Sequence, residues 1–334
     1  MKNTLLSLAA IALCAAGCNK EINRQNDVEE PEGTRSEVTF SFSDGRTDTR
    51  SATAASEEKV NSLQVLVFNP DGVLDSYGSS DSKSITLTVT TGKKMDIYAM
   101  VNGYEDLSDT RTKQELLQKG TWLNENTMNS LAMIGSTTET LTAGSSVTIP
   151  VTRFVGKVQI DGISVAFKSP GYASLQFKVK SIYLINACGS CLLTQDGTPE
   201  MWYNQRKYQA DECDDFLYEK INDVQVTASR PFKQSHYFYT YPNQTLTDTS
   251  AETWSPRYTR LVIEATLGDT VQYYPINIVG TDGKLSANHL YRITNATITG
   301  PGSNHPDILP EKGSIDFDII VVDWEDGFNR EETF

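Results

Sequence analysis

Short segments in which apolar and polar residues alternate recur along the chain. The clearest of them, residues 37–43, reads EVTFSFS and places Val38, Phe40 and Phe42 on one face, with threonine and serine on the other. Because successive side chains of a β-strand point to opposite faces, this alternation predicts a strand with one buried face. The chain therefore favours sheets that bury one side against a partner.

These segments are short, numerous and separated by turns, which is typical of β-sandwiches. Further strands are expected over residues 63–68, 85–89, 94–101, 147–151, 153–160, 175–179, 182–185, 237–241, 261–265, 273–278, 291–298 and 315–322. A helix is expected over residues 109–119, ended by Gly120, and residues 193–223 are expected to form a long loop with some helix. The sequence thus predicts an all-β fold with one or two short helices, in two parts that meet near Pro150.

The charge balance excludes one class of partner. Lys and Arg number 29 and Asp and Glu 43 among the 334 residues, a formal net charge of −14. Nucleic-acid binding depends on Lys and Arg side chains that neutralise phosphates, so no nucleic-acid partner is expected. Beyond the N-terminal segment, no apolar stretch approaches the roughly 20 residues of a membrane-spanning helix.

The first 18 residues are expected to be an export signal. They read MKNTLLSLAAIALCAAGC, with Lys2 ahead of a short apolar run, as in a secretory signal. The ending AAGC resembles a bacterial lipobox, in which Cys18 carries the lipid, palmitate included, and becomes the mature N-terminus. The alternative is an ordinary signal peptide, cut near Gly17, that leaves a free thiol.

Cysteine use agrees with export. Beyond the signal the chain contains Cys188, Cys191 and Cys213. Two cysteines separated by two residues occur in zinc and redox sites, but a zinc site needs a second pair of ligands and a thioredoxin-like site needs a βαβ unit. We expect no metal, and either a structural disulfide between two of these cysteines or plain buried thiols.

The sequence gives no sign of an enzyme. It contains no nucleophile elbow, phosphate-binding loop or HExxH helix, so we expect no catalytic residues and no cofactor. Four aromatic residues could stack on a sugar, although aromatic residues of sandwiches more often belong to the core or its rim. They are Trp202, Tyr203, Trp254 and Tyr258. They motivate an alternative function, that of a monomeric surface glycan-binding lipoprotein.

A loop suited to proteolysis follows the strand at residues 37–43. Residues 44–56 read DGRTDTRSATAAS, a run of small and polar residues with two arginines, Arg46 and Arg50. Exposed loops of this composition are preferred sites of cleavage. Cleavage here would separate the strand from the rest of the chain.

Four stretches together resemble the fimbrillins of Bacteroidales, the subunits of type V pili. They are RSATAASEEKVNSLQVLVFN at 50–69, YFYTYPN at 237–243, LSANHLYRITNATITGPGSNHP at 285–306 and IDFDIIVVDW at 315–324. The resemblance implies two transthyretin-like β-sandwich domains. The implied divisions are a signal peptide over 1–18, a propeptide over 19–50, and sandwiches over 51–150 and 151–334.

The family also implies how the precursor matures. An Arg-specific surface protease cuts after the position that matches Arg50 and leaves Ser51 as the new terminus; Arg46 ranks second as the site. The strand that carries Val38, Phe40 and Phe42 is then removed, which leaves unpaired strand edges and an apolar groove.

A C-terminal segment of a neighbouring subunit, about residues 313–334, is expected to fill that groove. Its candidate donor residues are Ile315, Phe317, Ile319 and Trp324. The alternative is that residues 315–324 form an ordinary edge strand of their own sandwich. Because each subunit both receives and donates, the contacts do not close and a filament grows.

The resemblance therefore implies a stalk subunit of a surface fimbria that supports adhesion. Its expected partners are like subunits, accessory tip and anchor subunits, and the Arg-specific protease, with a receptor of unknown identity. The precursor is expected to be lipid-anchored at the outer membrane and the mature chain to lie in a cell-surface fimbrium. A tip or anchor role in the same pilus is the alternative within the family.

Overall fold

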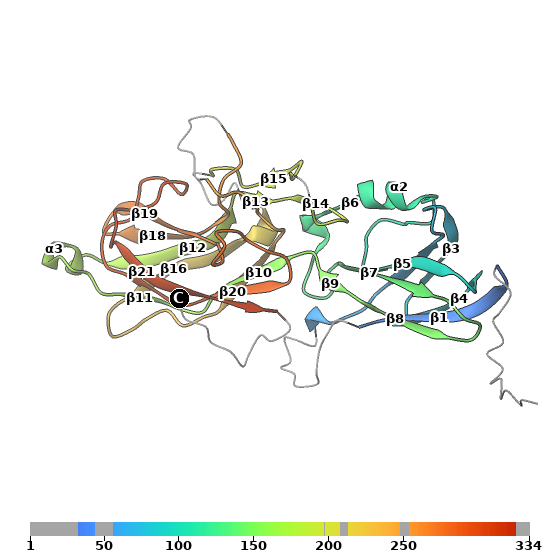
Figure 1. Cartoon of the computed structure of the whole chain (residues 1–334). Helices are drawn as coiled ribbons and strands as arrows, with labels where there is room; N and C mark the ends of the chain where they lie inside the picture. Colours follow the sequence, from blue (N-terminus) through green and yellow to red (C-terminus); the bar gives the residue numbers. More distant parts are fainter. Residues whose placement is uncertain (1–32, 44–55, 197, 208–212, 248–253, 325–334) are drawn as a thin grey trace, which may run out of the picture.

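The computed structural model describes residues 33–43, 56–196, 198–207, 213–247 and 254–324. Within them the chain forms an all-β protein whose two sandwiches lie end to end, with β1 at one end and α3 at the other (Figure 1). The predicted fold class is therefore confirmed. Cys18, Arg46, Arg50 and Ser51 lie outside the described residues.

The N-terminal sandwich consists of two sheets. The smaller has the order β4 (Ser84–Thr90), β1 (Arg35–Ser43) and β8 (Ser146–Pro150). The larger has the order β3 (Leu74–Ser80), β2 (Leu63–Phe68), β5 (Lys94–Val101), β7 (Met133–Thr140) and β9 (Thr152–Arg153). The chain passes from one sheet to the other between β8 and β9. Gly135 of β7 allows this close approach, because a Cβ there would lie 1.8 Å from the Pro150 carbonyl oxygen.

The larger N-terminal sheet is covered on both faces. Val65 and Val67 face the small sheet, in one apolar cluster with Val38 and Phe40. The alternate residues of β2, Leu66 and Phe68, belong to a second cluster that continues into the other sandwich. All six residues of β2 are consequently buried, which explains why the sequence LQVLVF is nearly apolar throughout.

The C-terminal sandwich also consists of two sheets. One has the order β11 (Ile163–Val165), β20 (His289–Ile298), β10 (Gly156–Ile160) and β17 (His236–Thr240), with β21 (Ile315–Asp323) paired to β20. The other has the order β16 (Tyr218–Val226), β12 (Phe177–Ile185), β18 (Arg260–Leu267) and β19 (Thr270–Asn277). Both inner faces contribute to one apolar cluster, which includes Val158, Ile182, Ile263 and Ile293.

Short elements join the two sandwiches. The strand β14 (Ser190–Leu192) of the C-terminal half pairs with β6 (Gly120–Trp122) of the N-terminal half. A further small pair joins β13 (Ala187–Cys188) and β15 (Trp202–Tyr203). The helical elements are α2 (Lys113–Gln118), α3 (Pro170–Ala173), η1 (Leu123–Glu125) and η3 (Asp215–Leu217). No helix within the described ranges is long and apolar enough to cross a membrane.

Several details differ from the sequence-based expectations. The helix begins at Lys113 rather than Asp109, because Thr112 and Glu115 form a capping box there. The segments 175–179 and 182–185 form one strand, β12, interrupted by a register shift between Val179 and Ser181. Residues 153–160 are split into β9 and β10, which belong to different sandwiches.

A buried carboxylate holds the loops of the C-terminal sandwich together. Arg257 and Arg260, each 1% exposed at the side chain, both pair with Asp307, and Arg206 lies 3.1 Å from the same carboxylate. Asn186 donates a further hydrogen bond to Asp307 at 2.8 Å. Residues from three separate loops and strands thus meet at one charge, which fixes their relative positions.

Two buried histidines predict acid sensitivity. Burial lowers the pKa of His236 and of His305 below the ordinary value of 6.5. The folded chain therefore binds protons less readily than the unfolded chain, and the free energy of unfolding falls as the pH drops below about 6.5. The phenyl ring of His236→Phe can stack on Phe232 as the imidazole does. In denaturant titrations between pH 7 and pH 5, we expect the free energy of unfolding of this variant to decrease less with falling pH than that of the wild type. An unchanged slope in the variant would contradict the role of His236.

Candidate functional site

The strand β1 lies in the middle of the small N-terminal sheet. It pairs antiparallel with β4 from Arg35 to Ser41 and parallel with β8 from Thr39 to Ser43. Phe40 is thus opposite Ile85 on one side and Val147 on the other. Both sides of β1 are hydrogen-bonded to neighbours, so its loss would leave β4 and β8 as two unpaired edges facing one another.

The inner face of β1 fills the core of this sandwich. Val38 and Phe40 are fully buried, and Phe42 is partly buried against the same cluster. Burial of a large apolar side chain contributes roughly 1.5–3 kcal/mol. Removal of the strand would therefore expose an apolar groove between β4 and β8, lined by Leu87, Val89, Val147 and Ile149.

The predicted donor segment forms an edge strand of its own sandwich. β21 pairs antiparallel with β20 along its length, from Ile298 opposite Ile315 to His289 opposite Asp323. Ile315, Phe317 and Ile319 are partly buried against the C-terminal core. The edge-strand alternative therefore describes this structure, and a donor role requires β21 to leave β20.

Trp324, directly after β21, occupies a closed site where the two sandwiches meet. Its backbone N–H donates to the Asn288 carbonyl at 2.9 Å, and its indole Nε1 donates to Glu57 at 3.2 Å. The ring stacks on Tyr239 with centroids 5.7 Å apart, and the Arg153 guanidinium lies 4.9 Å from its centroid. Only 8% of Trp324 remains exposed. We call Glu57, Arg153, Lys157 and Tyr239 the Trp324 seat.

The seat is held together by a buried charge pair. Lys157 Nζ lies 2.6 Å from the Glu57 carboxylate, and the Tyr239 hydroxyl donates to the same oxygen at 2.8 Å. Burial and the negative charge of Glu57 raise the pKa of Tyr239, so its hydroxyl remains a donor. Lys157 also lies 4.5 Å from the centroid of the Tyr237 ring. Residue 57, which follows the predicted cleavage loop, is thereby connected to the end of the predicted donor strand.

The other residues singled out in the sequence have structural surroundings. Cys188 and Cys191 are free thiols, so no disulfide joins two of the three cysteines, and the alternative of plain thiols describes the structure. Burial raises the pKa of the Cys188 thiol, and that of Cys191 to about 12, which keeps both protonated. Among the described residues, no group of three His, Cys, Asp or Glu side chains could hold a metal ion.

The aromatic residues considered for sugar stacking do not form an open platform. Trp202 is buried and packs edge-on against Trp254, which is itself covered by the Arg257 guanidinium. Tyr203 packs edge-on against Phe216. These rings therefore engage protein neighbours, and they give the glycan-binding alternative no support.

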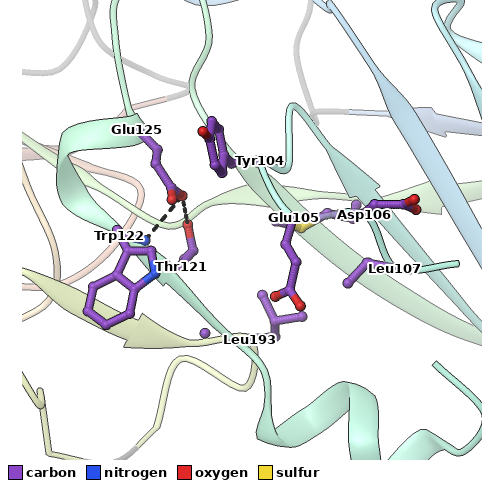
Figure 2. A pocket seen from close by; sticks show the side chains of 10 residues that line it. Tyr104, Glu105, Asp106, Leu107, Thr121, Trp122, Glu125 and Leu193 are labelled. Carbon is purple, nitrogen blue, oxygen red and sulfur yellow. Dashed lines mark hydrogen bonds between the residues drawn. The ribbon is translucent and has the colours of Figure 1, made fainter. Parts of the chain in front are cut away.

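An open pocket of about 430 Å³ lies near the junction of the sandwiches, beside β6 and η1 (Figure 2). Tyr104 and Trp122, which are both exposed, line it together with three carboxylates. Each carboxylate has a protein partner: Glu105 pairs with Lys119, Asp106 accepts from Ser108, and Glu125 accepts from Thr121. Because a ligand would compete with these bonds, we assign it no ligand.

Sequence patterns did not indicate the Trp324 seat. Glu57 belongs to a polar segment with no periodicity, so nothing there marks it as buried. Arg153 and Lys157 carry a weak signal, because they are charged residues next to the apolar residues Phe154, Val155 and Val158, and both are buried. A charged residue inside a predicted buried strand requires a partner, but the sequence does not say which one.

Comparison with known proteins places these features in a family context. Residues 36–169 match the family model described as "Major fimbrial subunit protein (FimA)". The resemblance to the fimbrillins is confirmed. The matched segment begins at the second residue of β1 and includes the rest of the small N-terminal sheet, the part of the chain that carries the removable-strand prediction.

Solved structures share the fold across most of the chain. A fimbrilin (FimA) from Porphyromonas gingivalis is 16% identical, with a TM-score of 0.61 over 86% of this chain and 97% of that one. A candidate cell adhesion protein from Bacteroides eggerthii is 20% identical, with a TM-score of 0.65 over 88% and 97%. The tip fimbrial protein Mfa3 from P. gingivalis is 14% identical, with a TM-score of 0.54 over 87% and 100%. No curated protein sequence matches the chain.

Proposed function

We propose that this chain is a stalk subunit of a surface fimbria, assembled by exchange of β-strands between copies. The precursor is exported, lipidated at Cys18 and held at the outer membrane. An Arg-specific protease cuts after Arg50, which releases β1, and β21 of another copy takes its place. The filament of like subunits then serves adhesion, together with accessory tip and anchor subunits.

The position of β1 is the observation that carries this proposal. It lies in the middle of its sheet, yet in the sequence it precedes all other described strands and is followed by a polar loop with two arginines. A single cut in that loop separates a central strand from the sandwich it completes. The vacated groove, with apolar walls and two unpaired edges, suits the addition of another strand.

The sequence of β21 matches that requirement. Val38, Phe40 and Phe42 alternate along β1, and Ile315, Phe317 and Ile319 alternate in the same way along β21. With Phe317 at the place of Phe40, each of the three positions keeps a large apolar side chain. The intervening residues of β21, Asp316 and Asp318, are exposed and would face solvent again.

Cleavage of the purified precursor tests the proposal. After treatment with an Arg-specific protease, we expect a new N-terminus at Ser51 and a ladder of multimers on denaturing gels of unboiled samples. Arg50→Gln should lose both the new terminus and the ladder, whereas Arg46→Gln, four residues earlier in the same loop, should lose neither. Clean cleavage that yields only monomers would contradict strand exchange.

A second role is favoured by one observation. β21 is fully paired within its own sheet and Trp324 is buried, an arrangement that a terminal subunit could keep permanently. Such a tip or anchor subunit would accept a strand after cleavage but would not donate one. Mixed with a polymerising subunit it would shorten filaments, whereas a stalk subunit would be incorporated along them.

A further inference from the structure

The Trp324 seat lies at the end of the groove that β1 occupies. The carbonyl oxygen of Ser43, the last residue of β1, accepts a hydrogen bond from the Val151 N–H at 2.8 Å. Val151 is two residues before Arg153, the guanidinium of which covers the Trp324 ring. Val151, at the end of the groove, and Arg153, which belongs to the seat, are therefore only two residues apart in the chain, at the junction of the sandwiches.

The attachment of β21 fixes the direction in which it could enter another copy. Its first residue, Ile315, is opposite Ile298 next to β11, whereas its last residue lies at the junction of the sandwiches. A released β21 stays attached at its N-terminal end, and β21 begins in the part of the molecule far from β1 (Figure 1). It would enter a second copy from the outer end of the N-terminal sandwich and run toward the junction, in the direction of β1.

The register then brings Trp324 of the donor to the seat. With Phe317 at the place of Phe40, Trp324 lies four positions beyond Ser43. At about 3.3 Å per extended residue this is a reach of about 13 Å, enough to pass Val151 and arrive beside Arg153. The acceptor's own Trp324 has left, because its β21 has been donated to the next copy.

An empty seat would be unfavourable. Its Lys157–Glu57 pair is buried, with side chains 9% and 5% exposed, and its donors and aromatic faces are arranged around an indole. Cations above the ring and a carboxylate at the indole N–H recognise tryptophan in particular. We propose that the seat is used twice: it holds the chain's own Trp324 in the precursor and the Trp324 of a second copy in the filament. This inference rests on the proposed strand exchange.

Cross-linking between unlike copies tests the inference. Precursors carrying Trp324→Cys and Tyr239→Cys are purified separately, mixed, cleaved, and treated with a short bismaleimide. Only a junction with a Trp324→Cys donor and a Tyr239→Cys acceptor can be linked through the seat. Wild-type protein controls for the native cysteines, of which Cys188 and Cys213 are buried. We expect covalent dimers on boiled gels of the mixture, but not of either variant alone.

The outcomes separate this inference from the proposed function. A ladder in unboiled samples without covalent dimers in boiled ones would overturn the double use of the seat and leave strand exchange intact. If wild-type protein forms no ladder after cleavage, both the proposed strand exchange and this inference are contradicted.

A second measurement covers the case in which Trp324→Cys does not assemble. The temperature at which the ladder dissociates is compared for Trp324→Phe, Glu57→Gln and the double variant. Trp324→Phe removes the indole N–H, and Glu57→Gln replaces its charged acceptor with a neutral amide oxygen. Because both substitutions weaken the same contact, we expect each to lower this temperature and the double variant to lower it by less than the sum of the two shifts. Additive shifts would overturn the inference, since the two side chains would then not meet in the filament.

Discussion

Oxidised His289→Cys/Asp323→Cys protein is expected to remain monomeric after cleavage at Arg50, and reduction is expected to restore the ladder of multimers. The two residues are directly opposite in the β20–β21 ladder, and their side chains lie 3.1 Å apart. Directly opposite residues of antiparallel strands have the Cα separation that a disulfide needs. The bond would fasten β21 to its own sandwich, so that no strand could be donated.

A second double-cysteine variant controls for any effect on assembly that a disulfide in this sandwich has by itself. Thr266→Cys/Val271→Cys joins β18 and β19, also directly opposite and in the same sandwich, in a ladder that stays closed in the proposed exchange. This variant should assemble whether oxidised or reduced. Assembly of the oxidised His289→Cys/Asp323→Cys protein, with the disulfide verified by mass, would show that β21 does not have to leave β20.

Phe40→Ala and Phe317→Ala are expected to have opposite effects before and after maturation. Phe40 is fully buried in the N-terminal core of the precursor, so its truncation should cost about 3–5 kcal/mol of unfolding free energy. Phe317 is only partly buried on the edge strand, and its truncation should destabilise the precursor less. Denaturant titrations of the uncleaved proteins measure both values.

In the filament the order should reverse. The residue at position 40 has been removed with β1, so filaments assembled from the Phe40→Ala precursor should dissociate at the wild-type temperature. Phe317 would fill the place of Phe40 in the neighbouring copy, so Phe317→Ala should lower the dissociation temperature markedly or prevent assembly. If both variants change precursor and filament in the same order, β21 does not replace β1.

Strands with an apolar face could be read from the sequence. The predicted ranges 63–68 and 94–101 coincide with β2 and β5, because the apolar residues of these segments are enough to predict a buried strand. Two long strands that the sequence does not indicate are polar: β3 reads LDSYGSS and β16 reads YEKINDVQV, and much of each is exposed or half-buried. Such strands form because they pair with an adjacent strand of the sheet, and the local sequence does not show which strand that is.

Pairings between distant residues limited the prediction of the site. The segment 315–322 was recognised as a strand, but its own sequence suits both the edge of β20 and the groove of another copy. The seat depends on Glu57 meeting residues 100, 182 and 267 positions away in the chain. No local pattern records contacts at such separations, whereas the alternation of Val38 and Phe40 records a buried face directly.

The most direct test of strand exchange is the structure of the filament by electron cryo-microscopy. We predict that residues 315–323 of one copy lie between β4 and β8 of the next, with Phe317 in the place of Phe40, and that the edge of β20 has lost β21. A filament in which every β21 still pairs with its own β20, and another segment or nothing fills the groove of β1, would contradict the account.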